Sequence, residues 1–115
     1  MNPIAQIPDN QLTHKLWEES KNQARLEREW EIVDHQRLVV LAELTKLSDE
    51  KSHAAAEREA RMTKEYKDFL IKRGEIKEQL TLARAKTKAI ELEIRLRINK
   101  SFAERAEYQG GKLNT

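Results

Sequence analysis

The sequence predicts an all-α protein: a long antiparallel helical hairpin, or coiled coil, that assembles into a dimeric bundle. Charged residues make up 37% of the 115 residues, compared with about 25% in an average globular domain. Apolar residues recur at steps of four and three in two long segments, and no segment alternates as a strand would. Residues 1–57 carry a net charge of −4 and residues 58–115 carry +6. This asymmetry indicates either that the two halves attract each other or that the basic half meets an acidic partner.

The first expected elements are an extended segment over residues 1–9 and a helix over residues 10–47. Pro3 and Pro8 disfavour helical backbone in the residue before each of them. Asp9 or Asn10 can then cap the helix by accepting a backbone N–H. The apolar positions of this helix form one stripe, here called the seam, which polar residues interrupt. The principal seam positions predicted here are Leu26, Trp30, Val33, Val40, Leu44 and Leu47.

Residues 48–52 are predicted to form a turn. Ser48, followed by Asp49 and Glu50, is typical of a helix start, with a capping hydroxyl and two acids that face the helix dipole. A continuous helix is the alternative, because the alanines that follow favour helix. Such a helix would be about 150 Å long at 1.5 Å per residue and would need a partner along its whole length. A fold-back instead lets the acidic half lie beside the basic half.

A second helix is expected over residues 53–109, followed by a flexible tail over residues 110–115. Gly74 lies inside the pattern and is interpreted as a weak point or a place of close helix approach, because glycine costs a helix about 1 kcal/mol. Gly110 and Gly111 are expected to end the helix. The seam of this helix is predicted to hold Met62, Tyr66, Phe69, Ile76, Leu80, Ile90 and Ile94.

The two predicted helices differ in length, so the second must extend past the first. Its apolar positions continue to Ile98. An overhanging apolar surface needs cover, which predicts self-association, with a dimer as the simplest form.

No catalytic or metal-binding pattern is present in the sequence. The chain has no cysteine and only three glycines, none in a phosphate-binding loop. His14, His35 and His53 share no helical spacing that would suit a metal. We therefore expect no enzyme activity, no cofactor and no metal. The N-terminus does not resemble a secretory signal, and the longest apolar run, residues 38–42, is too short for a bilayer. The expected location is the cytoplasm, with no membrane partner.

Two groups of residues are candidates for binding. Trp17 lies beside the seam next to Leu16, and it either packs on the N-terminal segment or anchors a partner protein. Arg84, Lys88 and Arg95 follow one side of the second helix and could contact nucleic-acid phosphates. Against this, the expected pairs Glu91–Arg95 and Glu93–Arg97 would partly neutralise that side. It also offers no aromatic platform for bases.

The segment ARAKTKAIELEIRLRINKSFAERAEY resembles small all-helical proteins from the early regions of bacteriophages and prophages. The resemblance lies in a long charged helix with the pattern Arg97, Ser101, Ala103, Arg105, Ala106 and Glu107. It implies a phage setting, in the host cytoplasm, and no specific binding residue. The leading hypothesis is a non-enzymatic interaction protein, an accessory factor of a phage early operon that binds another protein. The alternatives are a nucleic-acid-binding accessory protein and a structural or assembly scaffold.

Overall fold

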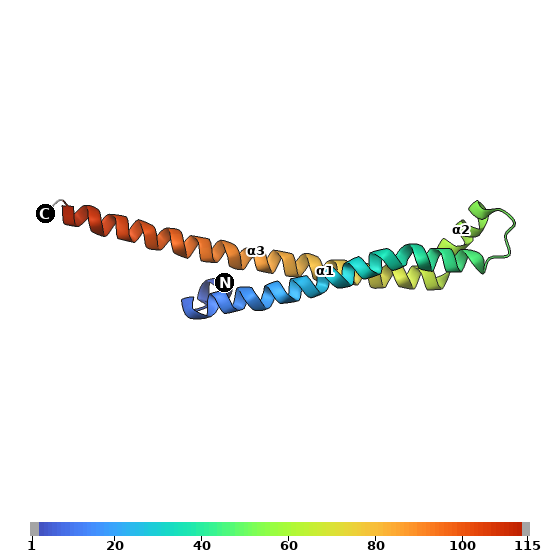
Figure 1. Ribbon diagram of the computed structural model, residues 1–115, viewed down its shortest axis with the longest axis horizontal. Coiled ribbons are helices and arrows are strands. Elements are labelled where there is room, and N and C mark those ends of the chain that lie inside the picture. Colours follow the sequence, from blue (N-terminus) through green and yellow to red (C-terminus); the bar gives the residue numbers. More distant parts are fainter. Residues whose placement is uncertain (1–2, 114–115) are drawn as a thin grey trace. The chain divides into compact units, whose positions relative to one another are not determined.

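The computed structural model describes residues 3–113, with side chains over residues 3–108. A short 3-10 helix, Pro3–Gln6, is followed by three α-helices: α1 (Asp9–Lys46), α2 (His53–Arg61) and α3 (Lys64–Leu113) (Figure 1). No residue between 3 and 113 is in a strand. The prediction of an all-α protein is therefore confirmed.

The chain forms two compact units. Unit 2 is the continuous segment 23–83, which contains the second part of α1, all of α2 and the first part of α3. Unit 1 combines residues 1–22 with residues 84–115, so it pairs the start of α1 with the second part of α3. The two units are described separately below.

The core of unit 2 lies between α1 and α3. Leu26, Leu80 and Ala83 are buried against one another, and Trp30 packs on them. Leu80 has no exposed surface, and burying such a side chain contributes about 1.5–3 kcal/mol. Asp34 accepts a hydrogen bond of 2.9 Å from Arg73. Residue numbers rise along α1 while those of their partners fall along α3, so the two helices run antiparallel in this unit.

Trp30 lies under two cations of α3. The guanidinium of Arg73 is 4.5 Å and the Nζ atom of Lys77 is 4.8 Å from the centroid of the Trp30 ring. The hydrogen bond from Arg73 lowers the pKa of the Asp34 carboxyl. Arg73 therefore contacts both Trp30 and Asp34 of α1. These two contacts explain how a charged residue can occupy a seam position of α3.

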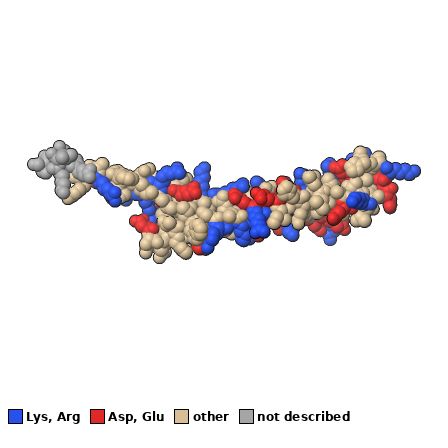
Figure 2. Space-filling model, in the orientation of Figure 1, with Lys and Arg blue, Asp and Glu red and all other residues tan. Residues whose placement is uncertain are grey.

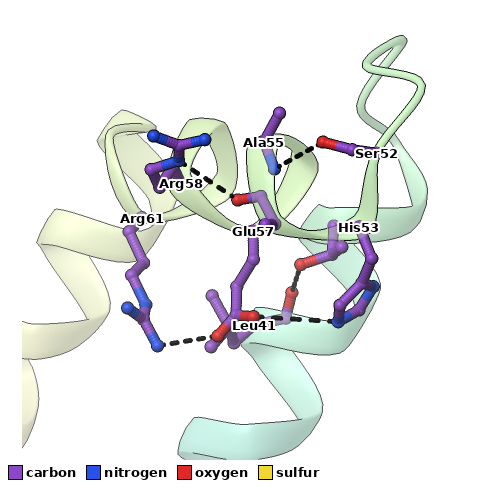
Figure 3. Close-up of polar contacts among 9 residues, drawn as sticks. Leu41, Ser52, His53, Ala55, Glu57, Arg58 and Arg61 are labelled. Carbon is purple, nitrogen blue, oxygen red and sulfur yellow. Dashed lines mark hydrogen bonds and ion pairs between the residues drawn. The ribbon is translucent and has the colours of Figure 1, made fainter.

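A loop after Lys46 leads to the short helix α2. The hydroxyl of Ser52 caps α2 by accepting a 3.1 Å hydrogen bond from the backbone N–H of Ala55 (Figure 3). Glu57 lies between His53 and Arg61, at 3.7 and 2.7 Å (Figure 3). α2 is thus stabilised by ion pairs between residues one turn apart and by the capping hydroxyl of Ser52.

Ser48 does not cap a helix, contrary to the expectation. Its hydroxyl accepts a hydrogen bond from the backbone N–H of Glu50 and donates one of 2.7 Å to Glu59. Ser52 takes the capping role because it directly precedes the first helical residue. At the start of α1, Asp9 is already helical, and the carbonyl of Pro8 accepts hydrogen bonds from residues 11 and 12.

The single helix predicted over residues 53–109 is corrected to two helices, α2 and α3. The chain leaves the helix at Met62, whose backbone N–H donates to the carbonyl of Glu59. The hydroxyl of Thr63 then donates to the carbonyl of Ala60 and accepts from the backbone N–H of Tyr66. Thr63 thus satisfies a carbonyl at the end of α2 and an N–H at the start of α3.

Two predicted seam residues are not buried. Leu47 is 79% exposed and Met62 is 72% exposed, because both lie just outside a helix end. The remaining predicted seam residues are buried or half-buried. They are Leu26, Trp30, Val33, Val40, Leu44, Tyr66, Phe69, Ile76, Leu80, Ile90 and Ile94.

The glycines of α3 do not interrupt it. At Gly74 an added Cβ would meet no atom within 4 Å, so the proposed close helix approach is wrong there, while the helix is unbroken as expected. Gly110 and Gly111 lie inside α3, which continues to Leu113, so they do not end it. Glycine makes a helix less stable without forbidding it. Within the tail expected at 110–115, residues 114–115 lie outside the described residues.

Unit 1 has its own antiparallel pairing. Leu12 on α1 and Ile90 on α3 are buried, and Glu19 and Thr87 are the buried polar residues. The segment expected to be extended over residues 1–9 contains the 3-10 helix Pro3–Gln6, while residues 1–2 lie outside the described residues. The backbone N–H of Ile7 donates to the carbonyl of Ile4, which closes this turn.

Candidate functional site

The second part of α3 carries an exposed apolar stripe in unit 1. Its members follow one another at steps of four, three and four residues. Each lies two positions after a core position, which places it roughly 200° around the helix, away from α1. Leu92 is 46% exposed and Leu96 is 64% exposed, whereas Ile90 has no exposed surface. We call this surface the outer stripe; it consists of Ala85, Leu92 and Leu96, which are exposed, and Ala89, which is half-buried.

Basic residues border the outer stripe. Lys88 and Arg95 lie along one margin and Lys100 lies on the other, and all three are exposed. Figure 2 shows Lys and Arg side chains interspersed with acidic and uncharged ones on the face in view. The acid next to the stripe, Glu93, is turned away from it, because its carboxylate accepts a 2.9 Å hydrogen bond from Arg97. The outer stripe is therefore apolar in the middle and basic at its edges.

The predicted nucleic-acid residues Arg84, Lys88 and Arg95 are all exposed on α3. Of the two ion pairs expected beside them, Glu93–Arg97 is present at 2.9 Å. Glu91–Arg95 is not among the ion pairs formed by the described side chains. Of these three residues, Arg95 is therefore less neutralised than the sequence indicates.

The other predicted binding residue, Trp17, lies on α1. It is 62% exposed, and the Nζ atom of Lys21 is 5.8 Å from its ring centroid. Its neighbour Leu16 is half-buried. Most of the indole therefore faces solvent. Trp17 and the basic residues of α3 lie on different helices, so they form two candidate surfaces.

Arg97 is a residue whose role the sequence reasoning missed. It donates hydrogen bonds to Asp9 at 2.6 Å and to Glu93 at 2.9 Å. It also donates to the carbonyls of Ile4 and Ala5, both at 3.4 Å. The carboxylates of Glu93 and Asp9 raise the pKa of Arg97. The sequence does contain an indication of this role, because Arg97 continues the four-three spacing of the seam after Ile90 and Ile94.

Glu19 is a buried carboxylate at a position of α1 where polar residues interrupt the seam. It accepts from Lys86 of α3 at 2.9 Å and lies 3.5 Å from Lys15 of α1. The hydrogen bond from Lys86 is the main cause of its lowered pKa, with Lys15 adding to the effect. A carboxylate held ionised in this way fixes α1 to α3 and is a poor proton donor or acceptor near neutral pH.

An open cavity of about 540 Å³ lies beside these lysines. Its lining is mostly apolar and comes from the N-terminal segment, α1 and Lys86. Among the described side chains, no group of three His, Cys, Asp or Glu residues could hold a metal ion. The helices within the described range also include none with enough length and apolarity to cross a bilayer. The lining residues are Pro3, Ile4, Ile7, Gln11, His14, Lys15 and Lys86.

No protein-family model, curated protein or solved structure matches this chain.

Proposed function

We propose that this protein is a non-enzymatic interaction protein that presents a helical surface to another protein, as an accessory factor of a phage early operon in the host cytoplasm. The observation that carries the proposal is the exposure of large apolar side chains on unit 1. Trp17, Leu92 and Leu96 are 62%, 46% and 64% exposed. Exposed apolar groups that lie in a row on one helix are typical of binding surfaces.

Affinity capture tests this proposal. The tagged full chain is incubated with a bacterial extract, and the retained proteins are compared between variants. We expect Trp17→Ala and Leu96→Glu each to reduce the captured partner. The control is Leu38→Glu, because Leu38 is as exposed as Leu96 at 64% but lies in unit 2. Equal capture by all variants, with helicity unchanged in circular dichroism, would exclude the proposed surfaces.

Self-association into a dimer is part of the same proposal. In unit 1, α1 begins at Asp9, which pairs with Arg97, so later residues of α3 extend past it. Ile98 is 50%, Phe102 63% and Tyr108 66% exposed. These side chains lie on a different side of α3 from Leu92 and Leu96. Sedimentation velocity should show dimers that Phe102→Glu dissociates, and a monomer at micromolar concentration would oppose this. Further growth with concentration would favour the scaffold alternative.

A second candidate function is nucleic-acid binding, favoured by the exposure of Arg84, Lys88 and Arg95 on one helix. Fluorescence anisotropy with labelled single- and double-stranded DNA and RNA tests it at low salt. Binding should weaken steeply as salt rises. The double variant Arg84→Glu with Lys88→Glu should abolish it. If the unmodified chain binds none of these probes at low salt, the candidate is excluded.

A further inference from the structure

We infer that the outer stripe of α3 binds an acidic amphipathic helix of another protein. The inference rests on the proposed function and names the chemistry of the partner. Its basis is the combination of an apolar centre, basic margins and an acid that is turned away.

The spacing of the stripe suits a helix as the occupant. Ala85, Ala89, Leu92 and Leu96 repeat with an average step of about 3.5 residues, the repeat with which two helices pack side by side. From Ala85 to Leu96 the stripe covers roughly 17 Å, or three helical turns. The alanines allow close approach, and the leucines provide apolar surface. An extended peptide would match this spacing less well, because its side chains alternate every second residue.

The margins favour an acidic occupant. Lys88 and Arg95 are exposed on one side of the stripe and Lys100 on the other. The carboxylate of Glu93 is used by Arg97, and the side chain of Glu93 is only 17% exposed. Residues 84–108 contain seven Lys or Arg and four Glu. A partner with Glu or Asp beside its own apolar stripe would face Lys88, Arg95 and Lys100.

A second copy of the chain fits this surface poorly. In a parallel pair in register, Arg95 of one copy would face Lys100 of the other, while Lys88 would face Glu93, whose carboxylate is already bound by Arg97. In an antiparallel pair centred on Leu92 and Leu96, the two Arg95 side chains would face each other. Like charges at such flanking positions oppose pairing. Self-association through Phe102 uses another side of the helix and remains compatible with the inference.

A nucleic acid also fits the outer stripe less well than an acidic helix. The centre of the surface consists of Leu92 and Leu96. Leucine offers neither a hydrogen bond to phosphate nor a stacking plane for a base. The basic residues alone could attract phosphates, but the apolar centre would then remain exposed.

A pair of designed peptides tests the inference with the full chain. One labelled peptide has three heptads with Leu and Ala in its stripe and Glu at the flanking positions, and the matched peptide has Lys in place of Glu. We expect fluorescence anisotropy to show that the Glu peptide binds at least about tenfold more tightly than the Lys peptide. Raising the salt concentration should reduce this preference, because screening weakens exposed charge pairs.

Variants identify the surface that binds. Leu92→Glu with Leu96→Glu should weaken binding of the Glu peptide by at least about tenfold, whereas Leu38→Glu should leave it unchanged. Lys88→Glu with Arg95→Glu should reverse the preference toward the Lys peptide. These residues are exposed, so helicity by circular dichroism should stay the same. The charge reversal supplies a second test if the leucine variants lose helicity.

Three results would overturn the inference: no binding of the Glu peptide, equal binding of both peptides, or binding that none of the α3 variants changes. Displacement of the Glu peptide from unmodified protein by a DNA oligonucleotide, with loss of DNA binding in the leucine variant, would assign the stripe to nucleic acid instead. If partner capture still depends on Trp17 while neither peptide binds, the inference fails and the proposed function stands. If both experiments fail, both are rejected.

Discussion

Replacing Leu80 with alanine tests the packing of unit 2 most directly. Leu80 has no exposed surface and packs with Leu26 and Ala83 between α1 and α3. Removing a buried leucine to alanine costs 2–5 kcal/mol, depending on how far the cavity collapses. The core here is only two helices thick, so the neighbours can partly close the space. We therefore expect Leu80→Ala to lower the free energy of unfolding by about 3 kcal/mol.

The matched control is Leu82→Ala, two residues further along the same helix. Leu82 is 63% exposed, so its truncation should change the free energy of unfolding by less than about 0.5 kcal/mol. The two variants remove the same atoms from the same secondary structure. The difference between them therefore measures burial against α1, separately from helix propensity.

Urea denaturation followed by far-UV circular dichroism provides the assay, with Trp30 fluorescence as a second probe of this core. Trp17 is changed to Phe in every variant, so that the fluorescence comes from Trp30 alone. In thermal denaturation, the same loss of about 3 kcal/mol should lower the melting temperature by roughly 10 °C. If Leu82→Ala costs as much as Leu80→Ala, or if Leu80→Ala costs less than about 1 kcal/mol, the assignment of the core-facing side of α3 is wrong.

Three further changes have defined outcomes. Gly74→Ala should raise the free energy of unfolding by about 1 kcal/mol, since the position is helical with open space around it, and thermal melting will measure this. Ser52→Ala should cost about 1 kcal/mol because the N–H of Ala55 loses its acceptor, while Ser52→Asp should retain stability. Protonation of Glu19 should destabilise the protein as pH falls below about 4.5. The pKa of Glu19 is lower in the folded than in the unfolded chain. Its contribution to stability is therefore fully present above the pKa of the unfolded chain and is lost as the pH falls through the pKa of the folded chain. Glu19→Gln should lower the free energy of unfolding by about 1 kcal/mol at neutral pH. It should also reduce the further loss of stability at acidic pH.

Opposite results would contradict the structural reasons for these changes. A loss of stability in Gly74→Ala would mean that another chain or segment closely approaches that glycine. Unchanged melting in Ser52→Ala would mean that α2 does not depend on its cap. If Glu19→Gln loses stability with falling pH as steeply as the unmodified chain, the pH dependence belongs to other carboxylates. Asp34, whose pKa is also lowered, is one of them.

The sequence predicts the helical class and the buried side of the helices well, because a four-three repeat of apolar residues directly reports which side is covered. The same repeat gives little information on where helices end. It runs through Met62, although Thr63 there separates α2 from α3. It also includes Leu47, which lies one residue past α1 and is exposed. Helix ends depend on capping hydrogen bonds, and several serines and threonines compete for each of these roles.

For the candidate site, the sequence leaves open whether Trp17 packs on the N-terminal segment or anchors a partner, and it does not reveal the roles of Arg97 and Glu19. Both are charged residues at positions where the repeat calls for apolar ones. Their partners, Asp9 and Lys86, are distant in sequence, so spacing within one helix cannot reveal them. The outer stripe was likewise missed, because its alanines do not stand out beside the larger residues of the seam.

The long-range pairs within each unit also have a consequence for how the chain folds. Asp34 and Arg73 are 39 residues apart, whereas Asp9 and Arg97 are 88 apart. Closing a loop costs more entropy as the loop lengthens, by about 0.6 kcal/mol for each doubling. Once residues 23–83 have formed their hairpin, the two segments of unit 1 are tethered to each other. The loop that remains to be closed between them is then effectively short. Loop closure therefore favours a zipper-like order, in which the middle of the chain folds first and its two ends meet last.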